Sequence, residues 1–299
     1  MASTFQSLYK KGLLPAAPKF LESNIQYEVI MGSMAYGVSS DSSDMDIYGF
    51  AIPPKDDVFP HLRGEVPGFD ECQPQFHQYQ IHHIWDQSAL AGKGREYDLT
   101  IYSITKYFRL LMENNPNIID SLFVPRNCVL HATQIANMVR ENRQLFLHKG
   151  CWAKFKGYAY SQIHKMENKE PIGKRRETIN QYGYDVKFAY HVVRLLYEVE
   201  QLLLEGDMDL LRYKEQLKAI RRGDWSMADV KAFFNEKEKS LEKVYLQSSL
   251  PAEPDRDRIR QLLLQCLEHH YGSLSEAVIV PDKASKTLQA IKQLLDEYQ

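Results

Sequence analysis

Residues 32–46 read GSMAYGVSSDSSDMD, and this stretch decides how the rest of the chain is interpreted. It opens with Gly32-Ser33, and ten residues separate Ser33 from Asp44. That separation allows one or two helical turns followed by a return into a neighbouring strand. Residues 25–31, directly before it, are rich in β-branched side chains and predict a strand that Gly32 ends.

Two aspartates close the stretch. Asp44 and Asp46 alternate by two, so on a strand both carboxylates face the same way. Neighbouring carboxylates repel each other, and an oxygen-seeking divalent cation such as Mg²⁺ neutralises them. At the other end, Gly32 lets the backbone approach a phosphate, while Ser33 and the N–H groups that open a helix favour an anion. Each feature alone is typical of turns, but together, between two strands, they indicate a site for a metal and a phosphate.

The remaining N-terminal pattern predicts both strands and helices. Further strands are expected over 45–52, which Pro53-Pro54 ends, and over 97–103. Helices are expected over 3–14 and 105–113 because their apolar residues recur at helical spacing. Residues 53–75 are crowded with proline, glycine and charge, and we expect a long loop or lid there.

From His131 onward the pattern is almost entirely helical. Helical spacing of apolar residues covers the stretches 152–167, 184–205, 209–221, 227–246 and 255–271. We therefore expect an α+β fold with a small mixed sheet and flanking helices in domain 1–135, followed by a helical domain over 136–299.

Charge is distributed unevenly, although the formal net charge is only -2. Residues 22–71 contain ten acidic and two basic residues, whereas residues 149–176 contain eight basic and two acidic ones. An acidic part thus precedes a basic part. This division favours a nucleic acid over a cationic small molecule as a partner.

Cysteines and apolar runs indicate the cellular setting. The four cysteines are far apart and form no CxxC pair, so neither a zinc knuckle nor a disulfide scaffold is indicated. No apolar run reaches the ~20 residues that span a bilayer, and the N-terminus has no apolar signal core. We expect a cytoplasmic protein with no membrane partner, and the sequence leaves its oligomeric state open.

The GSxAYG element, the ten-residue gap and SDxD together resemble the signature of the DNA polymerase beta nucleotidyltransferase superfamily. The wider pattern resembles its branch of predicted nucleotidyltransferases associated with RNA repair. The motifs that carry this second resemblance are YDLTIYS at 97–103, NPN at 115–117, GYA at 157–159, and the segment from Lys187 to Leu195. The resemblance extends to about Arg222 and no further.

The resemblance implies a polymerase-beta-like catalytic domain and a third carboxylate on a later strand. Asp98 is the best match, and Glu96, two residues earlier, is the competing candidate because it shares the same face. In the implied mechanism Asp44, Asp46 and Asp98 hold two Mg²⁺ or Mn²⁺ ions. An acceptor hydroxyl then attacks the α-phosphate of a nucleoside triphosphate, with ATP or CTP as the expected donor.

Residues expected to bind the nucleotide lie in the stretch 32–46 and on one later helix. Gly32, Ser33, Tyr36, Gly37 and Ser43 form the first group. Lys187, His191 and Arg194 form the second, because their i, i+4 and i+7 spacing places them on a single helix face. That face is either a solvated stripe or a clamp for phosphates. Tyr36 either packs against the nucleotide or closes the turn.

The basic run over 149–176 is the expected contact with RNA. Its interleaved aromatic residues suit single-stranded RNA, although the same spacing is also typical of a helix core. These aromatic residues are Trp152, Phe155, Tyr158 and Tyr160. The most exposed basic cluster is expected at Lys174-Arg175-Arg176, where it would contact RNA.

Three histidines, His77, His82 and His83, lack cysteine partners and are given no role as metal ligands. Three functions remain open. The first is nucleotide transfer to an RNA 3′ end in RNA or tRNA repair. The second is adenylylation of a protein or small molecule, and the third is non-catalytic binding of a nucleotide or RNA. The intact Asp44 and Asp46 pair disfavours the third, because a binding module does not need both carboxylates.

Overall fold

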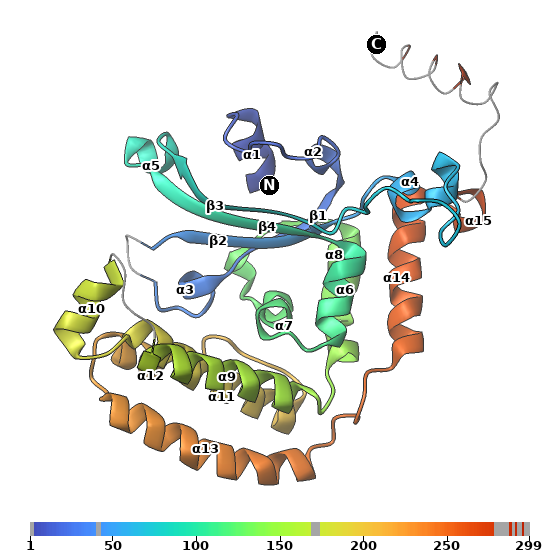
Figure 1. Cartoon of the computed structure of the whole chain (residues 1–299). Coiled ribbons are helices and arrows are strands. Elements are labelled where there is room, and N and C mark those ends of the chain that lie inside the picture. Colours follow the sequence, from blue (N-terminus) through green and yellow to red (C-terminus); the bar gives the residue numbers. More distant parts are fainter. Residues whose placement is uncertain are drawn as a thin grey trace.

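The computed structural model describes residues 3–39, 43–168 and 174–277, together with residues 287, 288, 291 and 295. Within these ranges a mixed sheet forms one layer, and helices from the second half of the chain form another beneath it (Figure 1). The short helix α3 and helices α6 and α7 lie between the two layers. The α+β fold expected from the sequence is confirmed.

Five strands form the sheet in the described part of the chain, in the order β3-β4-β2-β1-β5. Their bounds are Ile25–Ile30 for β1, Met45–Ala51 for β2, Gln78–Asp86 for β3, Arg95–Ser103 for β4 and Val129–Ala132 for β5. β2 and β4 pair in parallel, while the other neighbouring strands pair antiparallel. Because β2 and β4 are parallel, their N-terminal halves lie at the same end of the sheet, and Asp46 is paired with Asp98 there.

The sequence predicted β1, β2 and β4 but neither β3 nor β5. In β3, apolar and polar residues do not alternate regularly along QYQIHHIWD, and a bulge interrupts its pairing with β4 between Ile81 and Ile84. Strand β5 has only four half-buried residues, too few for a period of two to stand out. Both outer strands are therefore defined by their pairing with β4 and β1 and not by a pattern in their own sequences.

Helices precede, connect and flank the strands in the first half of the chain. They are α1 Thr4–Lys10, α2 Leu21–Asn24, α3 Gly32–Ala35, α4 Lys55–Val58, α5 Ala89–Gly92, α6 Ile104–Met112, α7 Pro116–Phe123 and α8 Gln134–Glu141, with 3-10 turns at Pro60–Arg63, Arg126–Cys128 and Arg143–Phe146. The predicted helices over 3–14 and 105–113 correspond to α1 and α6. Helices α7 and α8 were not predicted, although Asn115 and Thr133 cap their N-termini as such residues commonly do.

The second half is helical, as expected. Its helices are α9 Cys151–Asn168, α10 Lys174–Tyr182, α11 Val186–Glu205, α12 Lys214–Arg221, α13 Met227–Gln247, α14 Arg256–Tyr271 and α15 Leu274–Ala277. Helix α11 packs against α9, α12 and α13 and is buried along most of its length. Its N-terminus is fixed by Asp185, whose carboxylate accepts hydrogen bonds from the backbone N–H groups of Lys187 and Phe188.

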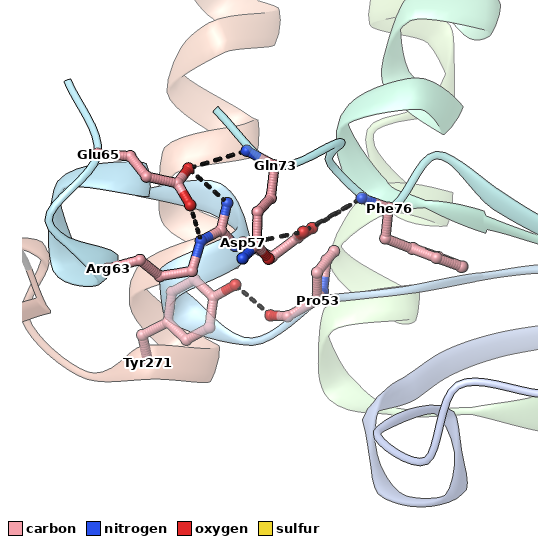
Figure 2. Close-up of polar contacts among 7 residues, drawn as sticks. All are labelled: Pro53, Asp57, Arg63, Glu65, Gln73, Phe76 and Tyr271. Atoms are coloured by element: carbon pink, nitrogen blue, oxygen red, sulfur yellow. Dashed lines mark hydrogen bonds and ion pairs between the residues drawn. The ribbon is translucent and has the colours of Figure 1, made fainter. Parts of the chain in front are cut away.

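Segment 53–76, which contains the loop or lid expected over residues 53–75, is held by internal contacts and by helix α14 (Figure 2). Asp57 accepts a hydrogen bond from the backbone N–H of Phe76. Arg63 pairs with Glu65, which also accepts from the backbone N–H of Gln73. The hydroxyl of Tyr271, at the end of α14, donates to the carbonyl of Pro53.

The buried side chains of the described residues form one continuous apolar cluster that runs from Phe5 to Leu267. Helix α14 contributes to this cluster by packing against α6 and α8 in the first half of the chain. The division at residues 135 and 136 stays a prediction. Among the described residues no helix is both long and apolar enough to cross a membrane.

Candidate functional site

A cavity of about 410 Å³ lies where the starts of β2 and β4 face helix α11. Its walls come from both halves of the chain. They are formed by Met31, Gly32, Ser33, Tyr36, Ser43, Asp44, Asp46, Tyr48, Asp98, Asn117, Lys187, Tyr190, His191, Arg194 and Arg221. Every predicted site residue except Gly37 therefore lines one space.

The three predicted carboxylates come together through strand register. Asp46 on β2 is paired directly with Asp98 on β4, and Asp44 lies just before β2. Burial, followed by repulsion from the Asp98 and Asp44 carboxylates, raises the pKa of Asp46 to about 6, although Lys187 counteracts this effect. The carboxylates therefore form a site with an excess of negative charge.

Gly32 lies against one of these carboxylates. Its φ is +64°, a conformation that favours glycine, and a Cβ at this position would be only 1.9 Å from Oδ2 of Asp46. The sequence predicted that this glycine allows close backbone approach to a phosphate. In the structure the group that it accommodates is the Asp46 side chain.

The bulge of β3 contacts Asp98. The backbone N–H of His83 donates to Oδ1 of Asp98 at 2.8 Å, and Nδ1 of His82 lies 3.2 Å from its Oδ2. His83 has a φ of +57°, which is uncommon for a residue other than glycine. The competing candidate, Glu96, is bonded to the His83 imidazole and does not line the cavity. Two of the three histidines set aside in the sequence analysis, His82 and His83, thus border Asp98.

Lys187 and His191 occupy the first turns of α11 and line the side of the cavity opposite the sheet. Lys187 is exposed, and its positive charge lowers the pKa of Asp46 against the larger effect of burial. The His191 ring lies against Tyr190, with ring centroids 4.2 Å apart. These two residues, which the helical spacing placed on one face of the helix, line the same cavity as the three carboxylates.

Arg194 is only 4% exposed, and its guanidinium is bound to other protein groups. Its Nη1 donates to Asp120 on α7 and to Glu198 one turn later on α11. The hydroxyl of Tyr36 also donates to Asp120, and the guanidinium lies 4.2 Å from the centre of the Tyr36 ring. These four side chains form a buried network that joins α3, α7 and α11 behind the cavity. Tyr36 is thereby held in the turn after α3.

Several lining residues were missed from the sequence. Tyr48 lies two residues after Asp46 and shares its face, so the strand period could have identified it. Asn117 in the first turn of α7 and Arg221 at the end of α12 gave no local signal. Arg221 donates to the carbonyl of Val38 and thereby connects α12 to the segment after α3. Gly37 packs toward Leu211 instead of lining the cavity.

The donor set fits a hard divalent cation by its chemistry. Asp46 and Asp98 present carboxylates from neighbouring strands, and their excess negative charge is the kind that Mg²⁺ or Mn²⁺ neutralises. Across residues 3–39, 43–168 and 174–277, however, no three Asp, Glu, His or Cys side chains form a complete metal-binding group. Asp98 is turned toward the His82-His83 bulge, where it accepts the hydrogen bond from His83.

The basic run is divided between core and surface. Trp152 and Phe155 of α9 are buried, so they are core residues, whereas Tyr158 and Tyr160 are exposed. The hydroxyl of Tyr160 donates to Glu238 on α13. Residues 169–173 and the side chains of Lys174 and Arg175 lie outside the described residues, while Arg176 is exposed.

The arrangement as a whole is typical of a nucleotidyltransferase. A Gly-Ser helix follows the first strand, carboxylates lie side by side on two parallel strands, and Lys187 of α11 lines the same cavity. Residues 13–294 match the RNA repair pathway DNA polymerase beta family, RlaP, and the chain belongs to that family. It is therefore a member of the nucleotidyltransferase superfamily, in a branch connected with RNA repair.

A solved structure, that of a nucleotidyltransferase-like protein from Exiguobacterium sibiricum 255-15, is similar to 88% of this chain and 72% of its own length. The two chains are 11% identical with a TM-score of 0.30, which is too low for a detailed comparison of their folds. None of the curated proteins matches the chain.

Proposed function

We propose that the protein transfers a nucleoside monophosphate from a nucleoside triphosphate to the terminal 3′ hydroxyl of an RNA, in a reaction that depends on a divalent metal. The observation that supports this is the cavity itself. Asp44, Asp46 and Asp98 line it together with Lys187, so the carboxylates that would hold a metal and a cation that would bind phosphate share one space. Family membership supports RNA as the acceptor.

Asp44, Asp46 and Asp98 would hold two Mg²⁺ or Mn²⁺ ions. When bound, these ions supply charge neutralisation and lower the pKa of the acceptor hydroxyl. The protein contributes the placement of the carboxylates: β2 and β4 fix Asp46 and Asp98 side by side, and Gly32 leaves room for Asp46.

The triphosphate would bind on the side of α3 and α11. Ser33 and Ser43 supply hydroxyl groups, while Lys187 and Arg221 supply positive charge. Arg194 contributes mainly by fixing Tyr36 and α7, because its guanidinium is already bonded to Asp120 and Glu198. ATP and CTP are the donors to test first.

In the transfer step, the acceptor oxygen forms a bond to the α-phosphorus while the bond from that phosphorus to the bridging oxygen breaks. Pyrophosphate leaves, and the proton of the acceptor hydroxyl passes to Asp98 or to water. Lys187 and Arg221 stabilise the negative charge that develops on the departing phosphates. Positioning and charge neutralisation are the principal catalytic contributions.

The helical part, residues 136–299, would be the domain that binds phosphates and RNA. Its contribution to the cavity comes from α11 and α12 through Lys187, His191, Arg194 and Arg221. Residues 1–135 would form the catalytic domain, since they carry all three carboxylates.

A labelling experiment tests the proposal. The protein is incubated with each α-labelled nucleoside triphosphate, Mg²⁺ or Mn²⁺, and either total RNA or total protein from the host. We expect label at RNA 3′ ends, removed by chelation of the metal. Label in the protein pool, or in neither pool, would contradict the RNA acceptor.

Asp46→Ala is the variant that tests the site. Transfer should fall by more than ~100-fold, since even the loss of groups around metal ligands costs roughly 10- to 100-fold. The matched control is Asp56→Ala, which removes an exposed carboxylate outside the cavity and should leave transfer unchanged. A folded Asp46→Ala protein that labels RNA at the wild-type rate would contradict the site assignment.

A further inference from the structure

Trp85 on β3 is 53% exposed, although tryptophan is usually well covered in folded proteins. Its indole N–H already donates to the side chain of Gln87 at 2.9 Å. The polar atom of the ring is therefore occupied, and what remains open to solvent is mainly its apolar surface.

One side of this ring lies on the backbone of Gly94. A Cβ at residue 94 would be 2.2 Å from Cζ2 of Trp85, and the φ of Gly94 is +80°, which also favours glycine. The hairpin between β3 and β4 thus holds the ring from one side and leaves a flat aromatic surface exposed.

Strand register places Trp85 next to the candidate site. Trp85 pairs with Glu96, and directly paired residues share a face of the sheet. Asp98 is two residues beyond Glu96, so Trp85 lies on the face that carries the carboxylates. Ile84 and Asp86, the neighbours of Trp85, are buried on the opposite face, where Lys11 of the segment after α1 pairs with Asp86.

The order of the strands places Trp85 and Ser33 on opposite sides of the carboxylates. Ser33 follows β1, Asp46 lies on β2, Asp98 on β4 and Trp85 on β3, and these strands are consecutive across the sheet. The proposed triphosphate site is on the β1 side of the carboxylates. Trp85 is on the other side, where an acceptor strand would have to approach.

The geometry points to Trp85 as a platform on which a base at the 3′ end of the acceptor RNA stacks, an inference that rests on the proposed function. An exposed ring beside positive charge suits a single strand, because bases stack while cations contact phosphates. The hairpin supplies that charge through Lys93, which is exposed and forms no ion pair within the described ranges. A purely apolar protein partner would not favour this combination of an aromatic ring with a cation.

Binding of RNA without nucleotide or metal tests the platform separately from catalysis. The probe is a fluorescein-labelled single-stranded RNA of about 12 nucleotides, within the range that one binding module covers, followed by anisotropy. Trp85→Ala should weaken binding by roughly 5- to 100-fold, the effect of losing one stacked base, while Trp85→Phe should retain most of the affinity. Phe69→Ala is the matched control, because Phe69 is 86% exposed but lies in segment 53–76, outside the cavity.

Wild-type binding by Trp85→Ala, or an equal loss in Phe69→Ala, would overturn the platform. Gly94→Ala gives a second route, since its added Cβ displaces the ring; unchanged RNA binding in this variant would also count against the platform. In steady-state transfer, Trp85→Ala should raise the KM for RNA and leave the KM for the triphosphate within about twofold.

The two proposals fail in distinguishable ways. If wild-type protein labels RNA but Trp85→Ala binds RNA normally, only the platform is wrong. If wild-type protein labels host proteins and no RNA, the proposed acceptor is wrong and the platform for RNA is rejected with it.

Discussion

At the scale of single residues, Gly32 shows how the signature stretch is built. Its positive φ turns the chain from β1 into α3, and its missing side chain leaves space for the Asp46 carboxylate. The glycine and the aspartate are 14 positions apart in the sequence, yet each limits the other. The motif is therefore a packing arrangement as well as a set of proposed ligands.

Gly32→Ala should lower both stability and activity. The backbone conformation alone costs roughly 1–2 kcal/mol for a residue with a Cβ, and the contact with Asp46 adds to this by displacing the carboxylate. Transfer should fall by at least about tenfold. Denaturant unfolding and the labelling assay measure the two effects.

Gly12→Ala is the control for backbone strain, because Gly12 has a similar φ of +70° and no atom within 4 Å of an added Cβ. This variant should lose stability without losing activity. If Gly32→Ala is as active and as stable as Gly12→Ala, the close approach to Asp46 has no functional importance.

At the scale of elements, the register between β2 and β4 and the bulge in β3 favour Asp98 over Glu96 as the proposed third carboxylate. Asp98 is paired directly with Asp46, whereas Glu96 lies two residues earlier on β4 and is bonded to His83. Bulges frequently reorient side chains beside active sites. Here the bulge provides the N–H group that contacts Asp98.

Asp98→Asn should therefore impair transfer by roughly 100-fold or more, beyond the 10- to 100-fold typical of groups outside the ligand set. Glu96→Gln changes the same atoms in the neighbouring position of the same face and should have a much smaller effect. Turnover of a labelled RNA end by the two purified variants gives the ranking. A reversed ranking would assign the third carboxylate to Glu96.

Helix α11 combines an exposed cation with a buried one. Arg194→Ala should destabilise the protein by about 3–5 kcal/mol, because Asp120 and Glu198 would remain buried without their partner. Burial already raises the pKa of both carboxyl groups above the usual range, which reflects how poorly this environment solvates charge. Equilibrium unfolding in denaturant measures the loss.

Lys187→Ala is the companion variant on the same helix. Lys187 is exposed, so unfolding should change by no more than about 0.5 kcal/mol. Triphosphate binding should instead weaken by about 1.5–3 kcal/mol, the contribution of a hydrogen bond to a charged group. Equal stability of the two variants would show that the buried network does not support α11.

At the scale of the whole molecule, α14 connects the end of the described chain to its first half. It packs on α6 and α8, and Tyr271 holds segment 53–76 through the carbonyl of Pro53 (Figure 2). Within that segment, Asp57 and Glu65 bind backbone N–H groups that a free loop would leave to water.

Tyr271→Phe should lower stability by about 0.5–1.5 kcal/mol, the usual contribution of one hydrogen bond. Hydrogen exchange over residues 53–76 should become faster, while transfer stays unchanged because none of these residues lines the cavity. Tyr245→Phe is the control, since the Tyr245 hydroxyl forms no hydrogen bond within the described residues. Unchanged exchange in Tyr271→Phe would mean that other contacts hold the segment.

The sequence by itself determined the main elements and most of the residues that line the candidate site. Local patterns were sufficient for β1, β2, β4 and the long helices, because period and end signals depend on neighbouring residues. Spacing alone also placed Lys187 with His191, since a helix fixes which of its own residues share a face. Asp44 lines the cavity with Asp46 although it lies just before β2, outside the strand whose alternation suggested the pair.

Only the tertiary structure decided which separate elements meet. The pairing of Asp46 with Asp98 depends on strand register, and the burial of Arg194 depends on Asp120, 74 positions away in another helix. Strands β3 and β5, the contact of His83 with Asp98, and the place of Arg221 in the cavity have the same origin. Local propensity cannot encode such contacts, because each arises when packing brings together segments whose own sequences carry no signal of the other.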